Sequence, residues 1–476
     1  MNYTTGKHVG STGDVPDCFM IPHGLPEFYS MGTRTQTSAE GRMMYEFHGD
    51  LITMPTRSCK RCFSTMHVNN TFVTQLRHLP FGGSLTFVSF TRKQYRCPKC
   101  GKTVMEEVPF RAEHHRITKS LEAYIEDLLA QGYTNKEITV MTGVDQGAVK
   151  AIDLERLRRE YTENVEGEGE DGTELLALKK PAQYSQFLII DEFKLHNHHR
   201  YATHIIDAET GHILWIDHGK SKRVIYNFIE HVGEEWMKHV KAVACDMNSD
   251  FQEAFEERCK WIQIVFDHFH IVKNFNDKVI SAVRKDEQKR LAESGDKEGA
   301  AALKKTKYIL TSKRETLRKK DQEAASGKVI SRGNGLFHQP EVKRHGGYED
   351  KYGELLQNNK LLFTLDLVKD QLEAAYAAAS KQAMAEIIDD VINVCRATEN
   401  AHFCWFARLL ESHYDGVIAH AVFQISTGKI EGINNKIKTL RRQGYGYPDD
   451  EYFFLKVIDS SYRPYVRNLK SHKVSH

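Results

Sequence analysis

The stretch FLIID at residues 187–191 ends a run of four apolar residues on a carboxylate, Asp191. A second stretch, AVACD at residues 242–246, repeats this pattern and ends on Asp246. Short apolar runs are typical of strands that are buried on both faces of a sheet. We therefore expect the two aspartates at the ends of neighbouring strands in one sheet.

The residues around these stretches alternate between strand and helix patterns. The expected strands lie near residues 186–191, 201–207, 212–217, 241–246 and 261–266, and the expected helices near 222–238 and 250–259. Three successive strands followed by alternating helices and strands are typical of a ribonuclease-H-like mixed sheet in an α/β protein. From about residue 270 to 425 the strand patterns stop and helix-forming residues dominate, which predicts a helical insertion.

A helix that begins near Glu431 supplies a third carboxylate. The apolar residues that recur at helical spacing and predict its buried face are Ile430, Ile433, Ile437 and Leu440. The polar residues that recur in the same way are Glu431, Asn434, Asn435 and Lys438. A carboxylate, two amides and an ammonium group on one face indicate the wall of a site, with Asn434 and Asn435 as supporting residues.

The three carboxylates Asp191, Asp246 and Glu431 are the oxygen ligands that phosphodiester chemistry with two Mg²⁺ (or Mn²⁺) ions about 4 Å apart requires. Each alone has a structural explanation, because strand-end aspartates often cap turns and a glutamate on a helix is usually solvated. The competing carboxylates are Glu192, Asp207, Asp250 and Asp267. Strand alternation is expected to send the side chain of Glu192 to the face opposite Asp191.

Histidines form two groups. We interpret the first group as surface or hydrogen-bonded residues; it comprises His196, His198, His199 and His204. His268 and His270 follow the last expected strand, and we interpret them as supporting residues of the same cleft. An alternative is that these two residues form an HxH metal-ligand pair of a histidine-liganded hydrolase.

Two CxxC pairs, Cys59 with Cys62 and Cys97 with Cys100, predict a structural zinc site, because four thiolates satisfy tetrahedral Zn²⁺ and leave no open position. The 34 residues between the pairs, 63–96, favour a zinc ribbon with an extended hairpin over a compact finger. The remaining five cysteines are scattered, and their odd total argues against a secreted disulfide framework.

Three helices with a helix-turn-helix outline are expected over residues 117–158. Gly132 is placed to end the first helix, Thr134 and Glu137 form a capping box for the second, and Gly143 precedes the third. The third helix would place Gln146, Lys150 and Arg156 near bases or phosphates of DNA. A plain packed helical subdomain is an equally good interpretation of this stretch taken alone.

Charge is unevenly distributed although the net charge is only +2. Residues 57–119 hold 12 Lys and Arg against 3 Asp and Glu, which suits a surface that contacts phosphates. A second basic stretch, 284–320, is interpreted as a solvated helix face. A basic cluster near the C-terminal end, also a candidate for DNA binding, comprises Lys436, Lys438, Arg441 and Arg442.

The polar N-terminal residues and the absence of any run of roughly 18 apolar residues predict a cytoplasmic protein, associated with the nucleoid when bound to DNA. We expect seven segments along the chain. They are an N-terminal arm of unknown role (1–50), a zinc ribbon (51–112), a helix-turn-helix domain (113–162), an acidic linker (163–182), the first part of the catalytic core (183–283), the helical insertion (284–425) and the C-terminal part of the core (426–476).

Together with the cysteine pairs and the helix-turn-helix outline, five motifs resemble the insertion-sequence transposases of the ISL-three type. These are IDEF at 190–193, YAT at 201–203, ACDMN at 244–248, DHFH at 267–270 and EGINNKIKTLRR at 431–442. The resemblance covers roughly residues 55–465 and is most specific in the last motif. Residues 219–223 only loosely match the Gly-Arg usual at that point, and residues 1–50 match nothing in the family.

The resemblance implies a DDE-type transposase with a ribonuclease-H-like core, acting on the terminal inverted repeats of its own element. It implies that Asp191, Asp246 and Glu431 are the catalytic triad. Because two DNA ends must meet, we expect a dimer or larger assembly on double-stranded DNA. The alternative from another class is a zinc-ribbon and helix-turn-helix DNA-binding regulator whose α/β domain is inactive.

Overall fold

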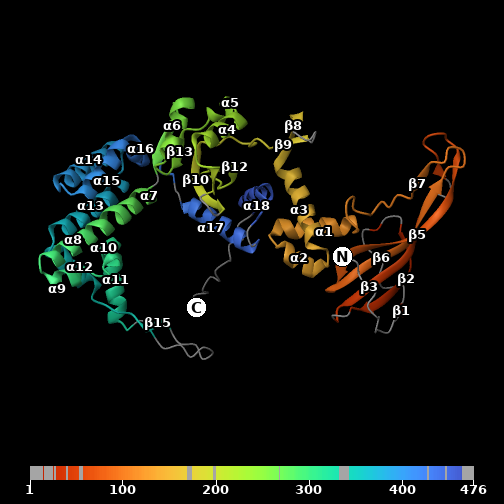
Figure 1. Cartoon of the computed structure of the whole chain (residues 1–476), viewed down its shortest axis with the longest axis horizontal. Coiled ribbons are helices and arrows are strands. Elements are labelled where there is room, and N and C mark those ends of the chain that lie inside the picture. Colours follow the sequence, from red (N-terminus) through yellow and green to blue (C-terminus); the bar gives the residue numbers. More distant parts are fainter. Residues whose placement is uncertain are drawn as a thin grey trace, which may run out of the picture. The chain divides into compact units, whose positions relative to one another are not determined.

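The computed structural model divides the chain into two compact units, which are best described separately (Figure 1). The first unit comprises Met1–Lys179 with Lys436–His476, and the second comprises Lys180–Asn435. The described residues are 14–15, 25, 28–38, 41–52, 57–168, 174–196, 200–266, 268–327, 329–331, 342–425, 428–444 and 447–463. The protein combines mixed sheets with many helices, which confirms the α/β class.

A seven-stranded sheet forms the first part of the first unit. Its strands are β1 (Asp14–Val15), β2 (Phe28–Thr37), β3 (Met43–Leu51), β4 (Arg57–Ser58), β5 (Thr65–Phe81), β6 (Ser84–Arg96) and β7 (Thr103–Met105). The order is β1-β2-β3-β6-β5-β4, and β7 pairs with β6. Gly82 and Gly83 make the tight turn between β5 and β6, where their positive φ angles of 53° and 80° suit glycine.

The prediction of a separate N-terminal arm over residues 1–50 is wrong for β2 and β3, which are long strands of this sheet. β3 pairs in parallel with β6 from Met44 opposite Leu85 to Gly49 opposite Phe90. The apolar cluster beside them joins residues that are far apart in sequence, namely Leu25, Leu51, Leu76, Val88, Phe90 and Phe110. Strands that are stabilised by such distant partners show only a weak pattern in their own sequence. This explains why the sequence does not predict β2 and β3.

Three helices follow the sheet, as the sequence predicts. They are α1 (Lys119–Gln131), α2 (Asn135–Thr142) and α3 (Gln146–Tyr161). Gly132 ends α1 in the left-handed conformation, and the capping box of Thr134 and Glu137 is present on α2. Ile125, Ile138 and other buried aliphatic residues of the three helices form one apolar cluster, so the helices pack as a unit.

The segment that its acidic composition predicts to be a linker contains a two-stranded sheet instead. Its strands are β8 (Thr162–Glu168) and β9 (Glu174–Leu178). The strand pairing is helped by Leu178, which packs against the cluster of Leu157 and Tyr452. Apolar partners outside the segment therefore stabilise it, although its own composition offers little to bury.

A five-stranded mixed sheet is the centre of the second unit (Figure 1). Its strands are β10 (Phe187–His196), β11 (Arg200–Asp207), β12 (Ile213–His218), β13 (Ala242–Cys245) and β14 (Gln263–Phe266), in the order β12-β11-β10-β13-β14. β11 runs antiparallel to both β10 and β12, whereas β10, β13 and β14 are parallel. The helices between the strands are α4 (Lys222–Val232), α5 (Glu234–Met237) and α6 (Ser249–Arg258).

A series of helices follows β14 and shares one hydrophobic core with the sheet. They are α7 (His268–Asn274), the π-helical turn η2 (Phe275–Ile280), α8 (Ser281–Glu293), α9 (Lys297–Ala302), α10 (Lys307–Thr311), α11 (Arg314–Ala325), α12 (Tyr348–Gln357), α13 (Lys360–Tyr376), α14 (Lys381–Ala397), α15 (Ala401–Ser412), α16 (Tyr414–Ile418) and the 3₁₀ turn η3 (Ala419–Ala421). One buried cluster extends from the sheet residue Leu188 to Ile418 on α16. A short strand pair, β15 (Val329–Ser331) with β16 (Val342–Lys343), departs from the purely helical prediction.

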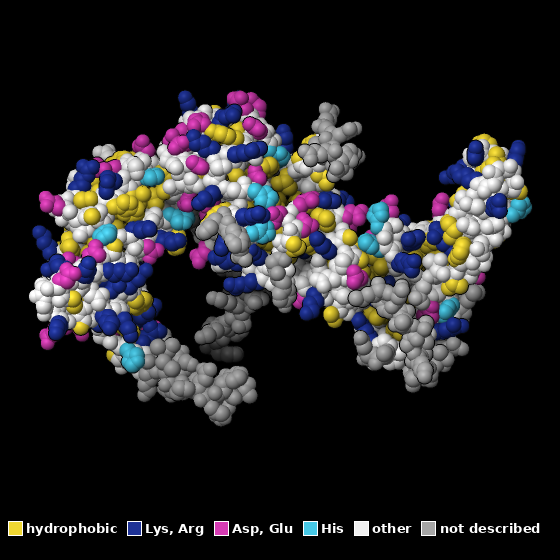
Figure 2. Space-filling view, viewed as in Figure 1, with side chains coloured by type: hydrophobic (Ala, Val, Ile, Leu, Met, Phe, Trp, Pro, Cys, Tyr) yellow, Lys and Arg dark blue, Asp and Glu magenta, His cyan; other side chains and the backbone are white. Residues whose placement is uncertain are grey.

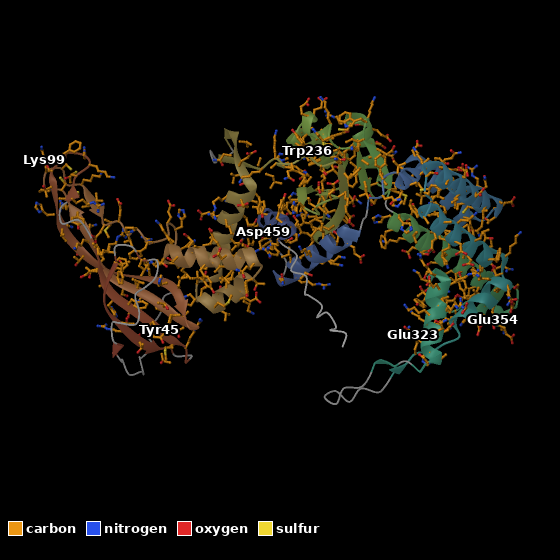
Figure 3. All side chains as sticks on the ribbon, turned by 180° about the vertical axis from the view of Figure 1, so that it is seen from behind. Tyr45, Lys99, Trp236, Glu323, Glu354 and Asp459 are labelled. Carbon is orange, nitrogen blue, oxygen red and sulfur yellow. The ribbon has the colours of Figure 1, made fainter. Side chains whose placement is uncertain are left out.

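Two helices complete the chain, α17 (Gly428–Gln443) and α18 (Asp450–Tyr462). Within the first unit, α18 packs against α3 through a buried charge network near Asp459 (Figure 3). Asp153 accepts hydrogen bonds from Arg156, from the Tyr452 hydroxyl at 2.7 Å and from Lys456 Nζ at 2.7 Å. Asp459 accepts a further bond from Arg156 Nη1 at 3.0 Å.

No helix among the described residues is both long and apolar enough to cross a bilayer.

Replacing Asp153 with alanine should destabilise the packing of α3 against α18. The side chains of Arg156 and Lys456 are only 10% and 6% exposed, so both would keep a buried charge that has lost a partner. Breaking a buried ion pair on one side costs about 3–5 kcal/mol. Hydrogen exchange of the α3 and α18 amides should register this loss of local stability.

Arg158→Ala is the matched control, because Arg158 pairs with Glu451 across the same two helices but at 40% and 50% side-chain exposure. Such surface pairs contribute about 1 kcal/mol or less. Equal losses of protection in the two variants would contradict a special role for the buried network.

Candidate active site and cysteine cluster

Adjacent parallel strands bring Asp191 and Asp246 to one edge of the central sheet. β10 pairs with β13 with Ile189 opposite Ala244, and each aspartate follows two residues later. Asp246 comes directly after β13, as expected, but the prediction that Asp191 ends its strand is wrong, because β10 continues to His196 through its pairing with β11. The residues directly before them, 188–190 and 242–245, are buried, so the core holds the backbone at both aspartates in place. Both carboxylates are half-buried.

The helix α17 contacts this edge through an amide. Asn434 Nδ2 donates a hydrogen bond of 2.6 Å to Asp191 Oδ2, while Asp191 Oδ1 accepts from the backbone N–H of Glu192 at 2.8 Å. Of the predicted apolar face of α17, Ile433 and Ile437 are buried and Leu440 is half-buried, while the side chain of Ile430 lies outside the described part of the chain. Glu431 lies one turn before Asn434, where its side chain is exposed.

The half-buried carboxylate of Asp246 is incompletely paired. Burial raises the pKa of its carboxyl group, and the negative charge of Asp191 adds to the effect, whereas His270 and Lys220 oppose it. Its Oδ1 is buried and has no hydrogen-bond partner within the described part of the chain. The side-chain oxygen Oδ1 of Asn434 is also buried and also has no hydrogen-bond partner in that part of the chain. Both oxygens are thus available to an electropositive ligand.

Glu192 lies near Asp191 and Asp246. We expected strand alternation to direct its side chain away from these two carboxylates. Its carboxylate accepts a 2.8 Å hydrogen bond from Asn248 Nδ2, just after Asp246. Burial raises the pKa of Glu192, and the charges of Asp246 and Asp191 raise it further. Because β13 ends at Cys245, the loop that follows can reach a side chain that alternation directs away from Asp191.

His204 is fully buried and lies opposite Asp191 in the β10–β11 register. Neither ring nitrogen has a hydrogen-bond partner among the described residues, so the expectation of a surface or hydrogen-bonded histidine is wrong here. Burial lowers its pKa to about 4, although the charge of Asp191 opposes the shift. The ring is therefore neutral at physiological pH, and no sequence signal distinguished it from the neighbouring histidines.

The other candidates of the site are distributed as follows. His270 lies close enough to Asp246 to influence its pKa, while His268 is exposed and packs edge-on against Tyr376. Asn435 is exposed. Of the competing carboxylates, Asp207 caps the turn at Thr210 and Asp250 lies in the first turn of α6, whereas Asp267 is outside the described residues.

Four cysteines form a compact cluster in the first unit. The sulfur atoms of Cys59, Cys62, Cys97 and Cys100 all lie within 4.8 Å of one another, and all four are free thiols. The backbone N–H of Ser64 is the main cause that lowers the pKa of Cys62 to about 6. Thiolates in this arrangement are the donors that tetrahedral Zn²⁺ requires.

Among the described residues, no other group of three or more His, Cys, Asp or Glu side chains brings its ligand atoms so close together. The carboxylates of Asp191, Asp246 and Glu431 are thus more widely spaced than the sulfurs. Their donor set nevertheless fits a hard cation, because it consists of carboxylate and amide oxygens, which Mg²⁺ prefers.

The residues expected to contact DNA differ in their surroundings. Gln146 is exposed at the start of α3, and Lys150 forms a 3.0 Å ion pair with Asp449. Arg156 is 9% exposed and belongs to the buried network with Asp153 and Asp459. This packing role leaves Arg156 out of the DNA contacts proposed below.

The basic residues of α17 also differ in their exposure and in their contacts. Lys436 donates to the Ser460 carbonyl at 2.8 Å, and burial lowers its pKa. Lys438 and Arg442 are exposed, and Arg441 is half-buried. A groove of about 740 Å³ in the first unit is lined by Gln146, Lys150 and Arg442 together with residues of α2 and α18.

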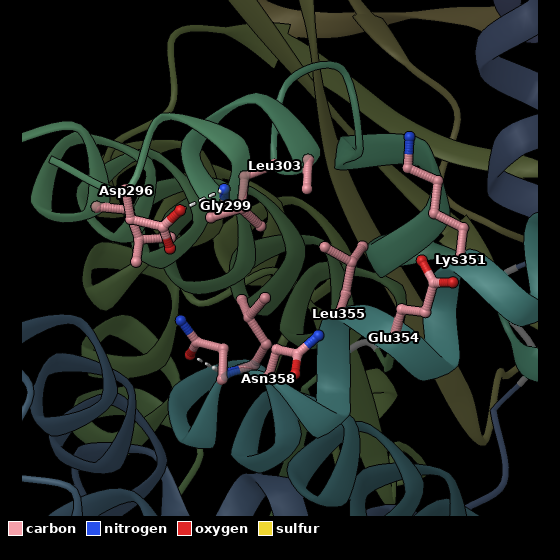
Figure 4. A pocket seen from close by; sticks show the side chains of 11 residues that line it. Asp296, Gly299, Leu303, Lys351, Glu354, Leu355 and Asn358 are labelled. Atoms are coloured by element: carbon pink, nitrogen blue, oxygen red, sulfur yellow. Dashed lines mark hydrogen bonds between the residues drawn. The ribbon is translucent and has the colours of Figure 1, made fainter.

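A second cavity, of about 140 Å³, lies among the helices of the second unit (Figure 4). Its wall includes Asp296, which caps α9 through the N–H of Gly299, and the aliphatic side chains of Leu303 and Leu355. None of the candidate active-site residues Asp191, Asp246 and Glu431 lines this cavity.

Comparison with known proteins shows the family to which the chain belongs. A family model of DDE proteins of the ISL-three type, described as a transposase, matches residues 188–457. The transposase for insertion sequence element IS1001 of Bordetella parapertussis is 27% identical over 404 residues, which cover 84% of this chain and 87% of that protein. The transposase for insertion sequence element IS1557 of Mycobacterium tuberculosis is 22% identical over 262 residues, 54% of this chain and 56% of that protein.

The family model and these relatives all describe transposases. Since the match spans more than half of the chain, the chain belongs to the insertion-sequence transposases of the ISL-three type. This confirms the resemblance carried by the sequence motifs.

We expect the purified protein to contain one Zn²⁺ per chain, measurable by atomic emission. Cys97→Ser should remove the metal and destabilise the knuckles, because Cys97 is fully buried and its sulfur lies 3.4 Å from that of Cys62. Cys404→Ser, outside the cluster, should keep the full zinc content. Zinc retention in the Cys97 variant would show that the cluster does not hold the metal.

Proposed function

We propose that this transposase binds the terminal inverted repeats of its insertion sequence and catalyses metal-dependent cleavage and strand transfer of DNA. The observation that carries the proposal is the hydrogen bond between Asn434 and Asp191, which brings the helix of Glu431 to the part of the sheet where Asp191 and Asp246 follow paired residues of β10 and β13. Family membership supports the same activity.

A ribonuclease-H-like core is the fold that we infer for the catalytic part. The supporting evidence is the strand order β12-β11-β10-β13-β14, with three antiparallel strands followed by parallel ones. We infer the helical segment after β14 to be an insertion in this core, because the chain returns through α17 to the sheet edge.

In this proposal Asp191, Asp246 and Glu431 are the catalytic carboxylates and hold two Mg²⁺ (or Mn²⁺) ions. Bound divalent ions would activate the attacking oxygen and stabilise the leaving oxygen. The unpaired Oδ1 of Asp246 and its raised pKa support this assignment, because a nearby cation would relieve both. Carboxylates repel one another until cations neutralise them, so Glu431 would approach the two aspartates only in the metal-bound enzyme.

Asn434 would hold Asp191 in orientation through its amide, and Glu192 would be held back from the reacting atoms by Asn248. In the first step a water oxygen attacks phosphorus, the bond from phosphorus to the 3′-oxygen breaks, and that oxygen leaves as a 3′-hydroxyl. In the second step this hydroxyl attacks another phosphodiester and displaces its 3′-oxygen. No covalent bond to the protein is needed.

DNA binding would fall to the first unit and to the basic residues of α17. We propose that Gln146 and Lys150, with Arg442 in the same groove, contact the element end, and that Lys438 and Arg441 contact the backbone. Lys436 would act through its bond to α18. Zn²⁺ in the cysteine cluster would be structural. A dimer or larger assembly would bring two ends together.

Asp191→Asn, Asp246→Asn and Glu431→Gln should each lower cleavage of a repeat-containing duplex by about 1,000-fold or more with Mg²⁺, because each removes a charged metal ligand. Binding of the same duplex should stay within about twofold. Gel assays of nicking and anisotropy measurements of binding separate the two effects.

Asp217→Asn is the matched control on the same sheet, since Asp217 bonds to Asn227 and lies on β12. It should retain cleavage. An inactive DNA-binding regulator would bind the repeats but cleave them in no variant, wild type included. A histidine-liganded hydrolase would lose activity with His268→Ala and His270→Ala and tolerate Glu431→Gln.

A further inference from the structure

The two cysteine knuckles have the same backbone geometry. Phe63 N–H donates to the Cys59 carbonyl at 2.8 Å, and Gly101 N–H donates to the Cys97 carbonyl at 3.0 Å. The N–H of each first cysteine in turn donates to the carbonyl five residues later, that of Ser64 for Cys59 and that of Lys102 for Cys97, both at 2.9 Å. Phe63 and Gly101 are therefore equivalent positions of the two knuckles.

This position requires a left-handed backbone, with φ of 59° at Phe63 and 72° at Gly101. Glycine adopts that conformation without strain, whereas a bulky side chain does so at a cost in free energy. The phenyl ring of Phe63 does not recover this cost by packing, because Phe63 is 83% exposed. Neither the backbone nor the core accounts for an aromatic residue here.

The surroundings of the ring are strongly basic. Lys60, Arg61, Lys99 and Lys102 are all exposed on the two knuckles. Residues 57–105 contain no Asp or Glu at all. Figure 3 labels Lys99 at this end of the sheet, and Figure 2 shows Lys and Arg side chains gathered there.

An exposed aromatic ring within a strongly basic surface matches the chemistry of duplex DNA. Phosphates attract the ammonium and guanidinium groups, and apolar side chains such as Phe insert between base steps in the minor groove. A second copy of this chain is a poorer partner for the same surface, because an equally basic knuckle would be repelled by its own charge.

We propose that Phe63 is a DNA-contacting residue that inserts its ring against a base step of the element end, while the exposed basic residues of both knuckles contact the flanking phosphates. This inference rests on the proposed binding of the element ends and adds a specific contact to it. The cysteine cluster then has a second role beyond folding, since it holds Phe63 at the surface in a conformation that its own backbone disfavours.

The test uses the full-length, zinc-loaded chain and a duplex that carries the terminal inverted repeat. Phe63→Gly should weaken binding by about 10-fold or more, as the loss of an aromatic contact with a base does. The dependence of affinity on salt should be unchanged, because no charge is lost. Zinc content and thermal stability should be equal to those of the wild type or higher, because glycine suits this backbone. Phe63→Trp should retain binding.

Lys60→Ala should instead make the slope of log affinity against log salt concentration less steep, by the amount that about one phosphate contact contributes. Phe363→Ala, which removes a 54% exposed ring from α13 in the other unit, is the control and should bind normally. Permanganate reactivity of thymines in the repeat should increase with the wild type and not with Phe63→Gly.

Unchanged affinity of Phe63→Gly alongside tight binding by the wild type would overturn this inference and leave the proposed function intact. A wild type that binds the repeat no better than a scrambled duplex would contradict the proposed function itself. If Phe63→Gly altered only the sedimentation of the chain, the ring would belong to a contact between copies, and the DNA contact would be refuted.

Discussion

One hydrogen bond determines how the candidate site is assembled. The amide of Asn434 and the carboxylate of Asp191 are 243 residues apart in the chain, yet they meet at 2.6 Å. The bond is made just beyond the last residues that pair β10 with β13, so it attaches α17 to the part of the sheet that carries Asp191 and Asp246. Every proposed role for Glu431 depends on this attachment, because Glu431 is one helical turn from Asn434.

A second constraint is electrostatic. Asp246 and Glu192 are half-buried carboxyl groups whose pKa values are raised by burial; the charge of Asp191 raises both further, and that of Asp246 also raises the pKa of Glu192. Such clustering of like charges destabilises a fold unless something offsets it. The buried carboxylates of the first unit differ, because each forms ion pairs. Asp153 pairs with Arg156 and Lys456, and Asp459 pairs with Arg156 and Arg463. The contrast supports a functional reason for the carboxylates at the sheet edge.

Much of the local structure was predictable because local patterns decide it. The apolar runs before Asp191 and Asp246 are buried strands, and the caps at Thr134 and Gly132 are present where the sequence predicts them. The strands at residues 28–51 were missed, because their stability comes from pairing with β6 and from packing with distant aromatic residues. Glu192 and His204 were misjudged for the same kind of reason, since a loop and a neighbouring strand determine their surroundings.

The sequence by itself determined the family, the strand and helix periodicity of the central sheet and the pairing of the cysteines into two knuckles, because these depend on residues close together in the chain. Only the tertiary structure decided which polar residue of α17 bonds to Asp191, that Arg156 is used for packing and that Phe63 remains exposed. Those outcomes depend on the burial and charge of groups brought together from distant segments, which no local pattern encodes.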